Sequence, residues 1–276
     1  MRVATFRDPS GQIHVGSITS TRVQQLEAPS MIAWLCGEGH ATAPDAWSLD
    51  DVTLLAPVPA PPSVRDFYAF EGHVAAGWRR REQPIPPYWY EAPAFYFSNP
   101  ASVIGPDEPV RRPASTRMLD FELEIAAVIG GAGQIAGFTL MNDWSARDVQ
   151  RQEMTVLLGP AKGKDFATTL GPWLVTPDEL PYRDGVLSIE AWVAVNGVEV
   201  GRSGTDAMQF TWDDLREHAA RDTHLRPGDV LGSGTLNRGC LLELGTLEGD
   251  RWIEPGDMVT LAAEGLGRLE TPVHSS

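Results

Sequence analysis

Two runs of alternating apolar and polar residues, joined by Asn196-Gly197, constrain the fold of this chain more than any other feature. The stretch LSIEAWVAVNGVEVGRS, residues 187–203, predicts two antiparallel strands. Asn-Gly suits the type I′ turn that joins such strands, because both central positions of that turn need positive φ. Pro-Gly-Asp turns at 227–229 and 255–257 each lead into a further predicted strand. The chain is therefore predicted to be rich in β-structure.

Few stretches predict helices. The clearest is FTWDDLREHAA, where Thr211 is the expected N-cap and Asp214 follows three residues later. A shorter helix is expected in APSMIAWLC, residues 28–36. Many strands with few helices predict an α+β, β-rich fold.

A proline-rich stretch divides the chain. Residues 1–56 carry short strand patterns around a DPSGQ turn, which indicates a small N-terminal domain. Residues 57–63, PVPAPPS, predict a stiff linker. Residues 64–276 then form a larger second domain, in which we expect any active site.

The charge balance excludes two classes of partner. The 276 residues include 37 acidic and 22 basic side chains, for a formal net charge of −15. Nucleic acids and anionic membranes both attract proteins with a basic face, so neither is expected as a partner. A small anionic substrate would need a local positive site in this acidic protein.

Cysteine content and hydropathy indicate the compartment. Cys36 and Cys240 are too few for a disulfide framework, and the chain contains no CxxC pair. The N-terminus lacks the apolar core of a signal peptide, and no stretch approaches the roughly 18 apolar residues of a membrane span. We expect a cytoplasmic protein.

An acidic pattern stands out in MLDFELEIAAVIG, residues 118–130, which alternates as a strand does. Its two predicted faces are Phe121, Leu123 and Ile125, and Asp120, Glu122 and Glu124. A polar face turned toward water gives the same alternation. However, three like charges in a row repel unless a positive group lies between them, and alternate side chains can converge on one cation. This stretch alone leaves both interpretations open.

The stretch MNDWSARDVQ places further charges directly after the apolar run IAGFTLMN. Asp143 offers a third carboxylate for a cation. Ser145 and Asp148 fit a helix-capping pattern, which gives Asp148 a structural explanation. Arg147 and Gln150 lie three residues apart and therefore share one face of the predicted helix. A surface helix would show the same spacing.

Three further candidates have ordinary structural explanations when each is taken alone. His73 lies in VRDFYAFEGHVAAGW, which is predicted to be loop-like, and a single histidine is more often structural than catalytic. Lys164 lies in AKGKD, which is typical of a solvated loop. Glu243 lies in CLLELG, where a strand glutamate facing water is the simplest interpretation.

Taken together, these stretches resemble the fumarylacetoacetate hydrolase family. DFYAFEGH, LDFELEIAAVIG, LMNDWSARDVQ, LLGPAKGKDFATTLGPWLV, LRPGDVLGSGT and LLELG occur in the family's order between Asp66 and Gly245. The resemblance implies a mixed β-sandwich roll, usually as a homodimer. The stretches that carry the resemblance cover most of the second domain.

The resemblance also implies roles for individual residues. The implied metal ligands are Asp66, Glu122, Glu124 and Asp143. The implied general base is His73, which is oriented by Glu243. The implied substrate and charge-holding groups are Lys164, Arg147 and Gln150, with substrate contacts from Tyr68, Tyr96 and Thr235. Thr168 matches a position near a second cation. A ligand set made only of oxygen atoms suits a hard divalent ion, Mg²⁺ or Ca²⁺.

The details resemble the fumarylacetoacetase branch of the family. The acylpyruvase and decarboxylase branch has a glutamate where this chain has Ala76. Two positions depart from the fumarylacetoacetase pattern, which has a tyrosine at Met154 and a substrate-binding arginine at Glu82, beside Arg81. The exact substrate is therefore not fixed by the resemblance.

The function implied is a metal-dependent hydrolase that cleaves a C–C bond in a small anionic 1,3-diketo acid. Water activated by histidine would attack the substrate. Two alternatives remain at this point. The first is an isomerase, hydratase or decarboxylase of keto acids in the degradation of aromatic compounds. The second is a binding or structural protein whose ion only stabilises the fold.

Overall fold

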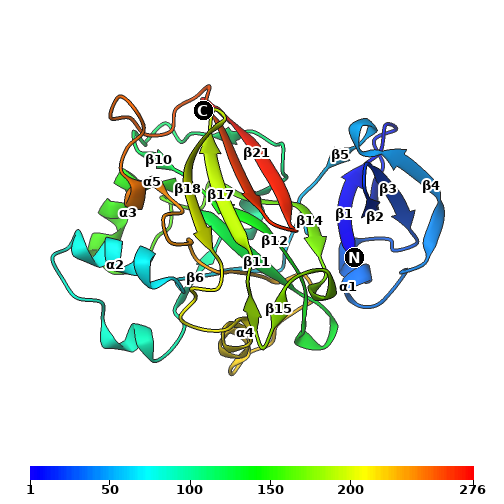
Figure 1. The fold of residues 1–276 in the computed structure, drawn as a ribbon, viewed down its shortest axis with the longest axis horizontal. Helices are drawn as coiled ribbons and strands as arrows, with labels where there is room; N and C mark the ends of the chain where they lie inside the picture. Colours follow the sequence, from blue (N-terminus) through cyan, green and yellow to red (C-terminus); the bar gives the residue numbers. More distant parts are fainter.

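The computed structural model describes residues 1–276 and places most strands in one large sheet (Figure 1). The path of this sheet runs β4 (Thr42–Ser48), β3 (Arg22–Leu26), β2 (Ile13–Thr19), β1 (Arg2–Arg7), β14 (Thr168–Val175), β12 (Ile135–Asp143), β11 (Leu123–Ile129), β19 (Val230–Gly232), β6 (Val64–Phe67) and β7 (Phe95–Ser98). Two short strands join it at the side, β5 (Thr53–Leu54) on β1 and β8 (Val103–Ile104) on β14.

A second sheet packs against the first. Its order is β18 (Val198–Gly204), β17 (Glu190–Val195), β20 (Met258–Ala263), β21 (Gly267–His274) and β9 (Val110–Arg111). The largest apolar cluster contains buried residues from both sheets, among them Ile125 of β11, Val193 of β17 and Leu261 of β20. The protein is therefore a β-rich α+β sandwich, as the sequence predicts.

Short elements complete the fold. Two small sheets pair β10 (Leu119–Asp120) with β13 (Ser145–Ala146), and β15 (Tyr182–Arg183) with β16 (Val186–Leu187). The helices are α1 (Met31–Leu35), α2 (Glu71–Arg79), α3 (Arg147–Glu153), α4 (Trp212–Ala220) and α5 (Leu241–Leu244). The 3₁₀ helices span Leu49–Asp51, Pro87–Tyr90, Pro100–Ser102, Gly131–Gly133, Met154–Val156 and Pro177–Glu179. None of the helices is long and apolar enough to cross a membrane.

The N-terminal strands form a lobe beside the main body, drawn in blue at the right of Figure 1. They have a small core of their own, formed by Ala4, Phe6, Ile18 and Val23. Antiparallel pairing of β1 with β14 joins this lobe to the large sheet. The division into domains at 1–56 and 64–276 remains a prediction.

The two clearest local predictions are confirmed. Asn196 and Gly197 connect β17 to β18 with φ values of 51° and 81°, as a type I′ turn requires. The side chain of Thr211 accepts from the Asp214 backbone N–H, and the Asp214 carboxylate accepts from the Thr211 backbone N–H. This reciprocal capping box starts α4.

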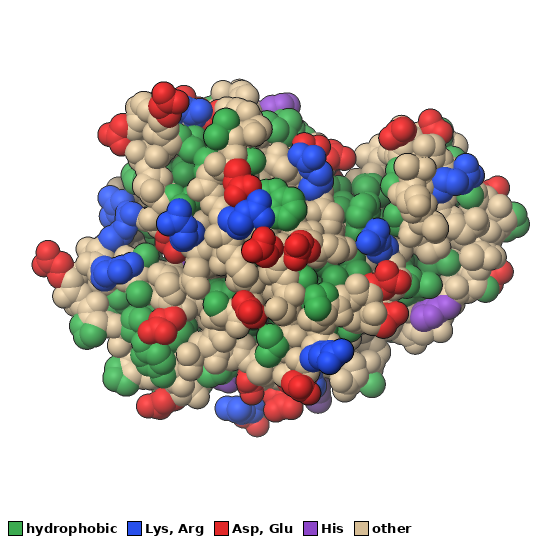
Figure 2. All heavy atoms as spheres, viewed as in Figure 1, with side chains coloured by type: hydrophobic (Ala, Val, Ile, Leu, Met, Phe, Trp, Pro, Cys, Tyr) green, Lys and Arg blue, Asp and Glu red, His purple; other side chains and the backbone are tan.

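Both faces of β11 are buried, which overturns the interpretation of residues 118–130 as a strand with one face in water. Leu123 and Ile125 face the core between the sheets. Ala126 and Val128 face a second cluster, which is formed with α1 and the linker. The predicted strand is also interrupted, because residues 121–122 separate β10 from β11. On the face drawn in Figure 2, acidic and basic side chains are interspersed, with no continuous basic patch.

Candidate active site

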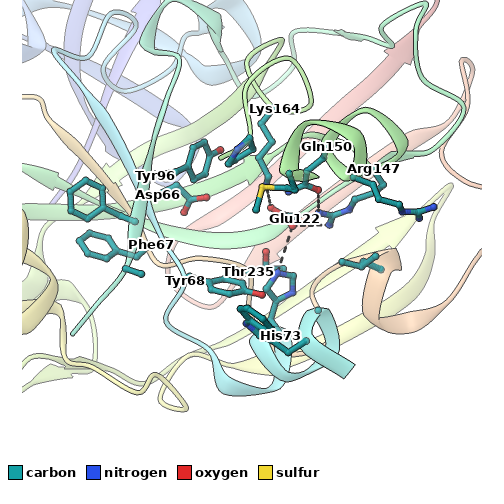
Figure 3. Close-up of a pocket in the computed structure, with 18 of the residues that line it drawn as sticks. Asp66, Phe67, Tyr68, His73, Tyr96, Glu122, Arg147, Gln150, Lys164 and Thr235 are labelled. Atoms are coloured by element: carbon teal, nitrogen blue, oxygen red, sulfur yellow. Dashed lines mark hydrogen bonds and ion pairs between the residues drawn. The ribbon is translucent and has the colours of Figure 1, made fainter. Parts of the chain in front are cut away.

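A cavity of about 440 Å³ opens beside the carboxyl-terminal ends of β6 and β12, between helices α2, α3 and α5. Figure 3 shows side chains from these elements converging on it. The predicted site residues that line it are Asp66, Tyr68, His73, Tyr96, Glu122, Glu124, Arg147, Gln150, Lys164 and Thr235. Segments far apart in the sequence thus meet at one place.

Four carboxyl groups cluster at this site, and all of them except Asp143 line the cavity. Asp66, Glu122, Glu124 and Asp143 are at most 4% exposed, and each offers one oxygen that lies within 4.8 Å of the other three. Gly232 of β19, which pairs with Asp66 of β6, leaves room for these carboxyl groups. A Cβ there would lie 2.5 Å from Asp66 Oδ1 and 3.1 Å from Glu124 Oε2. The four acids that were predicted to be metal ligands are therefore gathered in one cluster.

The chemistry of this acidic cluster fits a divalent cation. Asp66 Oδ1, Glu124 Oε2 and Asp143 Oδ1 are buried and have no hydrogen-bond partner. With Asp120, five buried carboxyl groups face only two buried cations, Lys164 and Arg147. Buried charges need compensation, and a hard cation bound by oxygen atoms supplies it.

The raised pKa values of two of these acids also indicate a site for a cation. Burial raises the pKa of Asp66 well above the usual carboxyl range, and the neighbouring Asp143 raises it further. Burial likewise raises the pKa of Glu124, with Asp66 adding to the effect. A cation held among these oxygens would favour the ionised carboxylates and reverse both shifts.

Lys164 lies in the site and not in a solvated loop. Its Nζ donates to Glu122 Oε2 and to Asp143 Oδ2, and the residue is 5% exposed. Burial lowers the pKa of Lys164, but Asp143 and Glu122 outweigh burial and raise it, so the amine is charged. Tyr96 donates from its hydroxyl to the same Asp143 Oδ2 at 2.7 Å. Lys164 therefore sets a fixed positive charge beside the acidic cluster.

Arg147, at the start of α3, is the second buried cation. Its Nε donates to Asp120 Oδ2 at 2.8 Å, and its Nη2 lies 2.7 Å from Glu122 Oε1. Its Nη1 donates to Gln150 Oε1 at 3.2 Å. Burial raises the pKa of Glu122, yet Arg147 and Lys164 more than offset burial and lower it below the usual value. Glu122 is thus ionised between two cations.

His73 and Glu243 form a hydrogen-bonded pair although 170 residues separate them. His73 Nδ1 lies 2.7 Å from Glu243 Oε1, which assigns the proton to Nδ1 because a carboxylate can only accept. Nε2 lies 3.8 Å from Glu122 Oε1, toward the cavity. The other Glu243 oxygen accepts from the Arg238 backbone N–H at 2.8 Å. The pair thus has the arrangement of a base and an orienting acid.

The local structure differs from what each of these residues, taken alone, indicated. His73 lies on α2 and not in a loop, and Glu243 lies on α5 and not in a strand facing water. The Tyr68 and His73 rings pack nearly perpendicular to each other, with ring centroids 5.4 Å apart. Burial raises the pKa of Tyr68 to about 12. This tyrosine therefore keeps its proton beside the histidine.

The predicted helix cap at Ser145 is also wrong. Ser145 lies in β13 and donates to the Asp143 carbonyl, while α3 starts after Ala146 without a side-chain cap. Asp148 accepts from the Thr116 hydroxyl and from the Arg117 backbone N–H. Its role is structural, as expected, but its partners differ from those predicted.

The remaining predicted contacts are distributed around the acids. Thr235 Oγ1 donates to Glu124 Oε1 at 3.3 Å. Thr168 is buried and lies 3.4 Å from Ser98 Oγ, and it does not line the cavity. Of the two departures noted in the sequence, Met154 lines the cavity and Glu82 does not, whereas its neighbour Arg81 does.

Two residues of the site were not identified from the sequence. Asp120 accepts from Arg147 and also from the Leu241 and Leu242 backbone N–H groups at 2.8 and 3.1 Å, at the start of α5. It therefore links Arg147 to the helix that carries Glu243. Cys240 Sγ lies 3.7 Å from both His73 Nδ1 and Glu243 Oε1. The position of Asp120 among the acids of residues 118–130 was the only signal for it.

Comparison with known proteins identifies the family. The model of the fumarylacetoacetate hydrolase C-terminal domain matches residues 63–274, which is more than half of the chain. The chain belongs to this family. Residues 1–57 match a second model, described as Rv2993c-like, N-terminal. The fumarylacetoacetate hydrolase family and the fold implied by the sequence resemblance are thus confirmed.

Individual proteins that are similar to this chain support the assignment to the family. Fumarylacetoacetase of Bos taurus is 32% identical over 254 residues, covering 70% of this chain and 60% of that protein. The chain thus spans less than two thirds of this longer relative. Protein Rv2993c of Mycobacterium tuberculosis is 33% identical, with 83% of this chain and 81% of that protein covered. A solved structure, 5-carboxymethyl-2-hydroxymuconate delta-isomerase of Mycobacterium smegmatis, is 29% identical, with a TM-score of 0.76 and full coverage of both chains.

Proposed function

We propose that this family member is a metal-dependent hydrolase that cleaves a C–C bond in a small 1,3-diketo acid of the fumarylacetoacetate or acylpyruvate type. One observation carries the proposal: a buried cluster of four carboxyl groups lies beside a hydrogen-bonded His–Glu pair, and three of the acids line one cavity together with the histidine. A cation site next to a general base is the arrangement that metal-assisted hydrolysis requires.

The metal would be held by Asp66, Glu122, Glu124 and Asp143. Mg²⁺ or Ca²⁺ fits because every donor is a carboxylate oxygen, and no thiolate or imidazole belongs to the cluster. When bound, such an ion polarises the carbonyl under attack and takes up the enolate charge of the leaving fragment.

His73 would take a proton from the attacking water at Nε2. The hydrogen bond from Nδ1 to Glu243 leaves the Nε2 lone pair free and holds the ring in one orientation. Glu243 also stabilises the imidazolium that forms when the proton arrives. Proton transfer by a positioned base typically contributes about 10²–10⁴-fold to the rate.

The cationic groups would hold the anionic substrate. Lys164 and Arg147 lie among the acids, and Arg81 lines the cavity with its guanidinium 5.1 Å above the Trp78 ring. A fixed positive group next to a developing oxyanion is worth about 10²–10³-fold in kcat. Gln150 is proposed to contact the substrate directly, since its amide nitrogen is not used by Arg147.

Tyr68, Tyr96 and Thr235 are proposed as further substrate contacts. Tyr96 and Thr235 each bond to an acid of the cluster through their hydroxyl groups. They therefore also set the orientation of Asp143 and Glu124.

The family usually forms homodimers, and we propose that this chain does so too. Light scattering should then give twice the mass of one chain, and the mass of a monomer would contradict the proposal.

An isomerase of a related keto acid is a second candidate. One observation favours it: the solved structure named as a hydroxymuconate delta-isomerase covers the whole of both chains, whereas the fumarylacetoacetase relative is covered only in part. Both reactions need a base and a stabilised enolate. Only hydrolysis needs a water molecule to attack, and the oriented His73 serves that step.

A panel of acylpyruvates and other 1,3-diketo acids tests the proposal. Each compound is incubated with the protein and Mg²⁺ or Ca²⁺, with EDTA as control. Loss of enol absorbance measures turnover, and mass spectrometry of the products separates the candidates. Hydrolysis gives two fragments that together have gained one water, whereas isomerisation gives a product of unchanged mass. No metal-dependent turnover of any compound would contradict both candidates.

A further inference from the structure

A second cavity, of about 360 Å³, lies on the other face of strands β6 and β7. Side chains alternate along β6, so Asp66 points into the active site while Arg65 points away from it. On β7, Tyr96 pairs with Asp66 and Phe97 pairs with Arg65, so Phe97 shares the face of Arg65. We call this second space the β6–β7 cavity. Its walls include Arg65, Phe95, Phe97, His218 and Arg221.

Arg65 at the base of the β6–β7 cavity is a buried cation with unused hydrogen-bonding capacity. The residue is 7% exposed, and its Nε and Nη1 atoms are buried without a hydrogen-bond partner. The nearest carboxylate oxygen, Asp229 Oδ2, is 3.5 Å from Nη1. The two oxygens of Asp229 already accept from Ser63 Oγ and the Arg226 backbone N–H, each at 2.7 Å. Buried donors of this kind usually have partners.

Flat apolar surfaces flank this guanidinium. Phe97 is 65% exposed, and the Arg65 Cζ lies 5.4 Å above its ring. Phe95 packs edge-on against Phe97 and His218, with ring centroids 5.4 and 6.0 Å apart. The exposed Phe97 ring beside the buried guanidinium offers a flat apolar surface that a ligand could cover. The walls therefore match a planar apolar group.

The rim adds one positive and one negative charge. Arg221 and Asp222 both line the cavity and are exposed. His218 Nδ1 is buried without a partner, and burial lowers the pKa of His218, with Arg221 adding to the effect, so the ring is neutral. The only buried charge with free donors that faces the cavity is therefore positive. This arrangement selects for an anion.

We propose that the β6–β7 cavity binds a small aromatic carboxylate. The guanidinium of Arg65 would donate to the carboxylate oxygens, and the ring of the ligand would lie against Phe97 and Phe95. Arginine recognises carboxylates through paired hydrogen bonds, and aromatic rings prefer offset or edge contacts with one another. This site does not depend on the proposed hydrolysis.

Calorimetric titration of the full chain with benzoate tests the proposal. Acetate, which lacks the ring, and benzamide, which lacks the charge, are the matched probes. Benzoate should bind at least about tenfold more tightly than either. Benzoate that binds no better than acetate, or no binding at all, would overturn the proposal.

Variants separate this cavity from the active site, which also holds cations. Phe97→Ala, at an exposed position, and Arg65→Gln should each weaken benzoate binding about tenfold or more, and Phe97→Ala should leave turnover unchanged. Circular dichroism checks that Arg65→Gln is folded, and Phe97→Ala carries the test if it is not. Lys164→Met should bind benzoate as the parent does. Loss of binding in Lys164→Met alone would place benzoate in the active site and overturn the proposal.

Discussion

Replacing Lys164 by methionine tests the electrostatics of the site. The change removes a buried ammonium that bonds to Glu122 and Asp143 while keeping a long, unbranched side chain. If Lys164 stabilises the oxyanion that develops during attack, its loss lowers kcat by about 10²–10³-fold. That corresponds to roughly 2.7–4 kcal/mol of activation free energy.

The affinity for metal, unlike kcat, should not fall when Lys164 is replaced by methionine. Lys164 donates to two of the carboxylates that are proposed to hold the ion, so it opposes a second cation. An ammonium and a divalent ion about 5 Å apart repel by about 7 kcal/mol at an effective dielectric constant of about 20. The Lys164→Met variant should therefore bind Mg²⁺ or Ca²⁺ at least as tightly as the parent. Without metal, its fold should lose about 3–5 kcal/mol, because two buried carboxylates lose their partner.

The assay combines steady-state kinetics, calorimetric titration with metal, and urea unfolding with and without metal. Lys162→Met is the matched control, because Lys162 is 75% exposed and pairs only with Asp165 at the surface. A surface pair contributes about 0.2–1 kcal/mol, so this variant should resemble the parent in all three measurements. Parent-like turnover by Lys164→Met, or joint loss of metal and turnover, would refute the reasoning.

Three further changes should each give a distinct result. His73→Ala should lower turnover by about 10²–10⁴-fold with calorimetric metal affinity unchanged; a loss of metal binding would contradict its role as base. Burial raises the pKa of Asp66 and Glu124, so metal binding should release protons and strengthen as pH rises, seen as a buffer-dependent heat. Because both pKa values are raised in the folded protein, the metal-free fold should also become less stable as pH rises through them. A metal affinity that does not change with pH would contradict this prediction. Asp120→Asn should lower the free energy of unfolding by about 3–5 kcal/mol in urea, because Arg147 loses a buried partner; parent-like stability would contradict it.

Local chemistry made parts of the fold predictable. The turn at Asn196-Gly197 and the capping box at Thr211 depend on residues within a few positions of each other, and both are confirmed. The helix cap predicted at Ser145 is not formed, because this residue takes part in strand pairing. Ser145 pairs with Asp120 between β13 and β10, which leaves it outside the helix.

The site depends on contacts that local patterns cannot specify. Alternation placed Glu122 and Glu124 on one face of a strand, but not whether that face meets water or protein. Glu122 is buried because side chains from distant segments cover it, namely His73 of α2, Arg147 of α3 and Lys164. The partnership of His73 with Glu243 came from family resemblance alone, because 170 residues separate them. Asp120 was missed as a partner of Arg147, because the break before β11 could not be seen in the alternation.

The account depends most on one divalent ion bound by four acids. A crystal grown with Mn²⁺, a hard divalent probe that prefers oxygen ligands, allows its position to be seen by anomalous scattering. The account predicts a single strong peak with oxygens of Asp66, Glu122, Glu124 and Asp143 about 2.0–2.6 Å away, the range of hard-cation ligands. A saturating concentration that gives no peak there, or a peak elsewhere in the protein, would contradict it.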